Sequence, residues 1–228
     1  MKEKSSFSAL LVGATGLVGT HCLEALLADP CYNSIIVLSR RTLRVEHPKL
    51  KTIVIDFNDL AKHAKQLRAD HVFNCLGTTI KAAGSQEAFR KVDFDYIYDI
   101  ARLTAQEGAK QFLLVSSIGA SSKSKIFYNR VKGELEDAVM PLPFQGVLIF
   151  RPSLILGKRP EKRAVEIMGK IFMGLFRPLL LGAFRKYRPI QAQVMGESMV
   201  HMAKTELRGS HIFESNQIQF FYDHLDNK

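Results

Sequence analysis

The sequence has no tryptophan and only three cysteines, and these shortages exclude several classes of protein. Cys22, Cys31 and Cys75 show no CxxC or CxxH spacing, so neither a zinc site nor a disulfide framework is predicted. The seven histidines also share no spacing, and we assign no metal ligands. So few cysteines are typical of a reducing compartment, and we expect a cytoplasmic protein.

Long hydrophobic runs are also missing. The apolar run that follows the first lysines is soon broken by Gly13 and Gly16, so we expect a buried strand there and not a secretory signal. The later apolar stretch over residues 171–184 contains Arg177 and Pro178. It is therefore too short and too polar to predict a transmembrane segment.

Positive charge is abundant: 32 lysines and arginines face 22 acidic residues, for a formal net charge of +10. Such a charge attracts nucleic acids, anionic membranes or anionic ligands. The basic residues are scattered and form no long basic tail, which argues against nucleic-acid binding. An anionic small molecule remains compatible with the charge.

Short apolar runs alternate with segments of helical spacing through the first two thirds of the chain. This alternation predicts an α/β protein with a Rossmann-type, doubly wound parallel sheet. The predicted strands are residues 9–12, 34–38, 51–55, 71–75, 111–115 and 146–151. The predicted helices between them are residues 18–28, 85–107 and 128–140.

The length of 228 residues fits a single domain, in which residues 152–228 form a small C-terminal segment on the substrate side. For this segment we expect helices at 161–176 and 197–204, a loop at 178–189, a strand at 211–213 and a terminal helix. The apolar residues of 167–184 allow ordinary packing, a substrate pocket, a subunit contact or a membrane contact.

A glycine-rich turn, GATGLVG, follows the first predicted strand and opens directly into a helix. Glycines at these positions let backbone amides approach a pyrophosphate, and the helix N-terminus favours its negative charge. The pattern alone is weak, but the strand before it and the helix after it supply the required context. The predicted cofactor-binding residues of this turn are Gly13, Thr15, Gly16, Leu17, Val18 and Gly19.

The end of the second strand selects between NAD and NADP. NAD-binding proteins usually place an acidic residue there, whereas this chain has Arg40 and Arg41, which suit a 2′-phosphate. A solvated basic loop is the alternative. Asp56, after the third strand, is either an adenine contact or an acidic turn residue, and Leu76 and Gly77, after the fourth, are placed against the cofactor.

A candidate catalytic group follows the fifth strand. Tyr128 and Lys132 are four residues apart and share a helix face, downstream of Ser116 and Ser117. Carbonyl reduction by hydride needs a proton donor, and a lysine cation stabilises the phenolate that a tyrosine donor leaves behind. We expect Ser117 to bind the substrate oxygen, Tyr128 to transfer the proton and Lys132 to hold the nicotinamide ribose, with Ser116 in reserve.

Six stretches of the chain resemble atypical short-chain dehydrogenase/reductases, in particular the HIV Tat-interacting protein group and its bacterial relatives. The stretches are GATGLVG, NCLGTT, VDFDY, LLVSSIGA, FYNRVKGELE and FRPSLILG. The resemblance implies NADPH held by the glycine turn, by the residues already named and by Tyr128 and Lys132. It also implies that Arg151, Pro152 and Ser153 pass near the nicotinamide.

One position departs from this superfamily. Many members carry an asparagine of the proton relay where this chain has Asp93. We expect an NADPH-dependent oxidoreductase acting on an unidentified small carbonyl or alcohol. The alternative is an NADPH-sensing regulatory protein that binds a protein partner with little or no turnover, and a homodimer is compatible with both.

Overall fold

The computed structural model describes residues 6–157 and 182–225 and contains a seven-stranded sheet. All its strands are parallel, in the order β3-β2-β1-β4-β5-β6-β9. The strands are β1 (Phe7–Val12), β2 (Tyr32–Ser39), β3 (Leu50–Val54), β4 (His71–Asn74), β5 (Gln111–Val115), β6 (Gly146–Arg151) and β9 (Gly209–Glu214). The predicted fold class is therefore confirmed.

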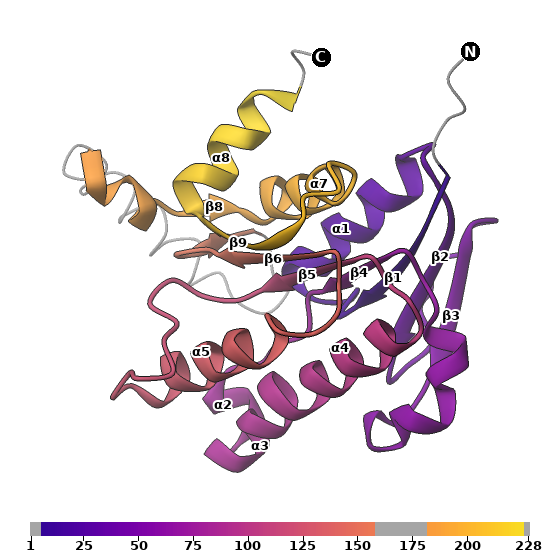
Figure 1. Ribbon diagram of the computed structural model, residues 1–228, viewed down its shortest axis with the longest axis horizontal. Helices are drawn as coiled ribbons and strands as arrows, with labels where there is room; N and C mark the ends of the chain where they lie inside the picture. Colours follow the sequence, from indigo (N-terminus) through magenta and orange to yellow (C-terminus); the bar gives the residue numbers. More distant parts are fainter. Residues whose placement is uncertain (1–5, 158–181, 226–228) are drawn as a thin grey trace.

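Helices cover both faces of this sheet (Figure 1). One face carries α1 (Leu17–Ala28), α7 (Ala192–Ala203) and α8 (Ser215–Asp223), and the other carries α4 (Tyr96–Gln106) and α5 (Phe127–Val139). Because central strands meet helices on both sides, their side chains must be apolar almost throughout. Val72 and Phe73 of β4, for example, are fully buried on opposite faces.

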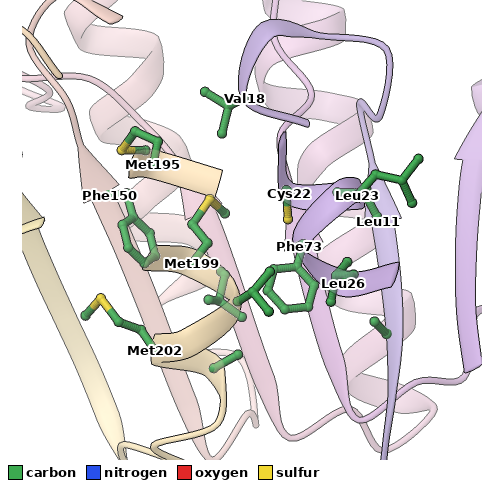
Figure 2. Packing of buried hydrophobic residues seen from close by; sticks show 14 of the residues in the cluster. Leu11, Val18, Cys22, Leu23, Leu26, Phe73, Phe150, Met195, Met199 and Met202 are labelled. Carbon is green, nitrogen blue, oxygen red and sulfur yellow. The ribbon is translucent and has the colours of Figure 1, made fainter. Parts of the chain in front are cut away.

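The core on the α1 face is packed between two helices and the sheet (Figure 2). Cys22 and Leu26 of α1 meet Met195 and Met199 of α7 above Phe73, and all five are fully buried. The two helices approach closely because α7 carries a glycine at the contact. A Cβ on Gly196 would lie 2.6 Å from the backbone nitrogen of Cys22.

The structure corrects several predicted boundaries. The helix predicted over 85–107 is divided into α3 (Gln86–Arg90), a π-helical segment η2 (Lys91–Asp95) and α4. The helix predicted from residue 197 begins at Ala192, and its N-cap, Gln191, makes no side-chain cap, so the usual start signal is missing. The predicted helix 161–176 lies outside the described residues.

Several elements were not predicted: four are too short to carry a full period of apolar residues, whereas η1 (Phe57–Leu67) has eleven residues with buried Phe57, Leu60 and Leu67 at helical spacing and was overlooked. A 3-10 helix, η3, lies within the predicted loop 178–189. The four short elements are α2 (Ile80–Ala83), β7 (Ile155–Leu156), η3 (Gly182–Tyr187) and β8 (Ile190–Gln191).

The order of the strands places a topological switch point between β1 and β4. From β1 the chain moves outward to β2 and β3, and it then returns to the other side of β1 to form β4, β5 and β6. Ligands of open parallel sheets bind beyond the carboxyl ends of the strands at such a point. Every motif singled out in the sequence for a cofactor follows the carboxyl end of one of these strands.

Candidate functional site

The glycine turn connects β1 to α1, and two of its glycines are required by the fold itself. Gly13 has a φ of +83°, and a Cβ there would lie 2.5 Å from the backbone carbonyl of Cys75. A Cβ on Gly19 would lie 2.0 Å from the carbonyl oxygen of Gly13. The turn is thus pressed against both the first helix and the chain that leaves β4.

Gly16 differs from its two neighbours. It is exposed, its φ is −80°, and a Cβ there would meet its nearest atom, the oxygen of Gly13, at 3.2 Å, which is a tight contact but a milder one than at Gly13 or Gly19. Gly16 is also the N-cap of α1, which has no side-chain cap and no acidic residue in its first turn. The helix N-terminus is therefore open to an anion.

Arg40 and Arg41 follow β2 at the same edge of the sheet. Both are exposed, and neither guanidinium has a hydrogen bond or an ion pair within the described residues. Only the backbone of Arg41 is held, by donating to Ser39 Oγ at 3.2 Å. Two guanidinium groups without protein partners thus lie at the carboxyl end of β2, the strand next to β1.

The two remaining strand ends on this side differ in what they offer. Asp56 accepts a hydrogen bond from the backbone N–H of Asn58 at 2.9 Å and so caps η1, as expected of an acidic turn residue. Gly77 follows β4 and lies against buried polar groups, because a Cβ there would be 3.3 Å from Asp93 Oδ1 and 3.8 Å from Lys132 Nζ. Leu76 beside it packs on the α4 and α5 face.

Tyr128 and Lys132 lie one turn apart at the start of α5. The Tyr128 ring is partly buried and packs 5.4 Å from the buried Phe89 ring. Ser117 is also partly buried and donates to the carbonyl oxygen of Ile118 at 3.3 Å. Within the part of the chain that the structure describes, no hydrogen bond joins Tyr128, Lys132 and Ser117 to one another.

Lys132 is buried in an ion pair. Its ammonium lies 2.8 Å from Asp93 Oδ1, and the two side chains are 4% and 0% exposed. The other carboxylate oxygen of Asp93 accepts the backbone N–H of Thr78 at 2.8 Å. The sequence singled out Asp93 only as a departure from a pattern, and this contact to Lys132 was missed.

A second buried carboxylate, Glu136, lies one turn further along α5. It accepts a hydrogen bond from the Ser116 hydroxyl, and both its oxygens face the Arg151 guanidinium, whose Nε lies 3.0 Å and 3.1 Å away. The same hydrogen bonds hold the pKa of Arg151 above its usual range. This network joins the ends of β5 and β6 to α5, and the sequence analysis missed it.

The residues that follow Arg151 are bound within the protein as well. Pro152 is buried, and its carbonyl accepts the N–H of Ile118 at 2.9 Å. Ser153 donates its hydroxyl to the carbonyl of Arg188 at 2.6 Å and its N–H to Ser215 at 2.8 Å. These contacts hold the strand end beside the loop that carries Ser117.

Residues 9–132, more than half of the chain, match the NAD dependent epimerase/dehydratase family. The chain belongs to this family. Among curated proteins it is similar to the mitochondrial protein fmp52 of Emericella nidulans, with 34% identity over 93% of this chain and 94% of that protein. It is also similar to mitochondrial FMP52 of Candida albicans, with 31% identity over 89% and 90%.

Solved structures share the fold across nearly the whole chain. The Bordetella bronchiseptica enzyme WbmG in complex with NAD has a TM-score of 0.70 at 14% identity and covers 100% of this chain and 80% of its own. The oxidoreductase ylbE of Lactococcus lactis has a TM-score of 0.66 at 16% identity and covers 97% of both chains. At this identity the two likenesses concern the fold alone.

These comparisons bear on the expectations in two ways. The family supports an oxidoreductase with a pyridine nucleotide, without deciding between NAD and NADP. The expected cytoplasmic location is wrong, because the curated relatives are named mitochondrial. A low cysteine count is typical of proteins in reducing environments, but it does not distinguish one such compartment from another.

Two kinds of feature are missing from the described residues. No helix there combines the length and the apolar character needed to cross a bilayer. No three acidic, histidine or cysteine side chains there gather into a possible metal site. The three cysteines are free thiols, and burial raises the pKa of the Cys22 thiol.

Proposed function

We propose that this protein is an NADPH-dependent oxidoreductase of the short-chain dehydrogenase/reductase type, acting on a small carbonyl or alcohol. The observation that carries the proposal is the gathering of unlike groups at one edge of the sheet. The uncapped helix N-terminus follows β1, and the two free arginines follow β2. The buried lysine, with a tyrosine one turn before it, lies on the helix after β5, on the other side of the switch point. Each group matches a different part of NADPH or of the reaction.

The first groups suit the cofactor's phosphates. The open amides at Gly16 fit the pyrophosphate, because the helix N-terminus favours an anion and the glycine leaves room for it. Arg40 and Arg41 fit the 2′-phosphate, because a guanidinium group that has no partner in the protein is free to form charged hydrogen bonds with a phosphate. These features support NADPH over NADH, and we propose a place near the HIV Tat-interacting protein group on the sequence stretches that resemble it.

The remaining groups divide the chemistry. NADPH supplies the hydride, and the protein supplies binding, orientation and the proton. Tyr128 gives its hydroxyl proton to the oxygen of the substrate, and the Lys132 ammonium stabilises the phenolate and holds the nicotinamide ribose. Ser117 donates a hydrogen bond to the same oxygen; Ser116 is unsuited to this role because its hydroxyl is donated to the buried Glu136.

The C-terminal segment lines a cleft whose lining, among the described residues, includes none of Ser117, Tyr128 and Lys132. The cleft has a volume of about 900 Å³ and lies between η3, β8 and α8. Leu156, Phe213 and Phe220 give it mainly apolar walls, and Arg185 lies among the polar residues that line it. We propose that residues 152–228 form the substrate side within a single domain.

Calorimetric titration with NADPH and NADH tests the cofactor assignment. In the double variant Arg40→Ala/Arg41→Ala, NADPH affinity should fall by at least roughly tenfold while NADH affinity stays unchanged, because only the 2′-phosphate loses its partners. The matched control is Lys51→Ala/Arg68→Ala. It removes the same charge from exposed positions near the amino ends of β3 and β4, away from the proposed cofactor site. A wild-type protein that binds neither nucleotide would overturn the proposal.

Turnover is tested separately with a panel of aldehydes and ketones, by following the oxidation of NADPH. Tyr128→Phe should abolish turnover and leave NADPH affinity nearly unchanged, because the hydroxyl acts only in proton transfer. A protein that binds NADPH tightly and reduces no member of the panel would contradict the enzymatic part. That outcome would favour the NADPH-sensing alternative.

A further inference from the structure

Asp93 is the most deeply buried charged group in the candidate site. Its side chain is 0% exposed, and it projects from the π-helical segment η2, a distortion that often marks functional positions. One oxygen pairs with Lys132 at 2.8 Å, and the other accepts the N–H of Thr78 at 2.8 Å. The carboxylate thus ties α5 to the loop that leaves β4.

The ion pair lies directly against the backbone at the end of β4. A Cβ on Gly77 would come within 3.3 Å of Asp93 Oδ1 and 3.8 Å of Lys132 Nζ. Because Gly77 has no side chain, it does not cover the ion pair on the side of the switch point. A ligand bound beyond the carboxyl ends of β1 and β4 would therefore lie close to both charges.

The nearest carboxylates of α5 have cationic partners of their own. Lys132 is paired with Asp93, whereas Glu134 pairs with Arg90 and Arg130 and Glu136 pairs with Arg151. Because Asp93 and Lys132 are both buried, a change of one charge there is poorly screened by solvent. Removal of the Asp93 carboxylate would leave one unbalanced positive charge beside the ligand.

The two redox states of the cofactor differ in the charge that matters here. The oxidised nicotinamide ring is a cation, and the reduced ring is neutral. We propose that Asp93 is a positioning residue that balances the charge of Lys132 and thereby sets the relative affinity of the site for oxidised and reduced cofactor. This inference rests on the proposed function, and it adds a role for a residue outside the expected catalytic group.

The test compares the dissociation constants of NADP⁺ and NADPH for the full chain and for Asp93→Asn, measured by calorimetry at mildly acidic pH. The amide is nearly isosteric with the carboxylate and retains an oxygen to accept the N–H of Thr78. Affinity for NADP⁺ should fall by about tenfold relative to NADPH, because only the oxidised ring is repelled by the uncompensated ammonium. A structural role alone would weaken both redox states equally.

Two further variants keep the test decisive if Asp93→Asn fails to fold. Lys132→Met leaves the carboxylate unbalanced; measured at mildly alkaline pH, where the buried carboxylate stays ionised, the ratio should shift the other way and favour NADP⁺. The double variant Asp93→Asn/Lys132→Met restores neutrality, and its ratio should return to that of the wild type even though overall affinity falls. The matched control, Glu134→Gln, removes a partly exposed carboxylate from the same helix and should leave the ratio unchanged.

The outcomes separate this inference from the function on which it rests. If all variants bind both redox states with the wild-type ratio, Asp93 does not set the balance and the inference is wrong, while the proposed function stands. If the wild-type protein binds neither redox state, both fail.

Discussion

Polar side chains at the two ends of the parallel sheet differ in whether they have partners within the protein. At the amino ends of the strands, Asp70 accepts two hydrogen bonds from Ser8 and pairs with Lys110 at 3.0 Å, and the Tyr32 hydroxyl hydrogen-bonds His71 at 2.8 Å. These groups find their partners within the protein. They stabilise the fold and leave little for a ligand to bind.

At the carboxyl ends, polar groups are left open. Arg40, Arg41 and the Tyr128 hydroxyl have no hydrogen-bond or ion-pair partner within the described residues, and the first turn of α1 is uncapped. Polar groups without protein partners contribute little to stability and are available to a ligand. The comparison indicates that changes at the amino ends alter stability and that changes at the carboxyl ends alter binding.

Gly13→Ala breaks this rule with the largest expected effect, because the carboxyl end also contains backbone that the fold requires. The substitution adds a Cβ 2.5 Å from the backbone of Cys75 at a φ of +83°. Strain and overpacking together should lower the free energy of unfolding by about 4 kcal/mol. Urea denaturation followed by circular dichroism measures this loss.

Two other glycines provide the matched controls. Gly108 has a φ of +86° with nothing within 4 Å, so Gly108→Ala should cost only the backbone strain, about 1 kcal/mol. Gly16→Ala should leave the free energy of unfolding within roughly 1 kcal/mol and still weaken nucleotide binding. Equal losses of stability for Gly13→Ala and Gly16→Ala would show that the turn is purely structural.

Glu136→Ala is the second exception at the carboxyl end. The change leaves the Arg151 guanidinium and the Ser116 hydroxyl without their buried acceptor. Breaking a buried ion pair on one side typically costs several kcal/mol, and since Arg151 is 23% exposed we expect a loss of about 3 kcal/mol. Thermal unfolding of the purified variant checks this value.

The control for Glu136 is its neighbour on the helix. Glu134 pairs with Arg90, but both side chains are partly exposed, 31% and 42%. Glu134→Ala should therefore change the free energy of unfolding by less than about 1 kcal/mol. If Glu136→Ala lowers the free energy of unfolding as little as its control does, the network at the end of β6 is open to solvent or to a ligand. The carboxyl ends would then have one exception fewer to the rule that changes there alter binding.

His71 tests the amino end through pH. Burial lowers the pKa of His71 from 6.5 to about 4, so the folded protein holds the ring neutral while the unfolded chain protonates it near 6.5. Stability from this residue is complete above pH 6.5 and is lost as the pH falls towards 4, with about 2 kcal/mol lost by pH 5. Urea unfolding over this range measures the slope.

His71→Gln removes the titrating group and keeps a side chain that can accept a hydrogen bond from the Tyr32 hydroxyl. The variant should show a flatter dependence of stability on pH between 6.5 and 5, with nucleotide affinity unchanged. A slope equal to that of the wild type would assign the acid sensitivity to other groups. Asp70, whose pKa is lowered despite burial because of Ser8 and Lys110, loses its contribution only at more acidic pH.

The sequence predicted the sheet far better than it predicted the contacts of the site. Continuous apolar runs suffice to mark strands buried on both faces, and the glycine turn with its flanking strand and helix was placed correctly along the chain. The partners of Lys132 and Glu136 could not be predicted in this way. Asp93 and Arg151 lie on other elements, and no spacing rule relates residues that meet only after the helices pack on the sheet.

Tyr128→Phe has the smallest expected effect on stability and sharpens the comparison most directly. Its ring packs on Phe89, and the phenylalanine ring would keep that contact. Because the hydroxyl has no partner within the described residues, its loss should change the free energy of unfolding by less than about 0.5 kcal/mol. Urea denaturation and NADPH titration of the same sample measure stability and binding together.

A loss above roughly 1 kcal/mol in Tyr128→Phe would mean that the hydroxyl is satisfied within the fold. Tyr128 would then resemble Tyr32, whose hydroxyl is held by His71 at the amino end, and Tyr32→Phe is the matched control for that outcome. The open carboxyl end would lose its candidate proton donor. A stable Tyr128→Phe variant that binds NADPH normally leaves the hydroxyl free for the substrate, which is the condition that proton transfer requires.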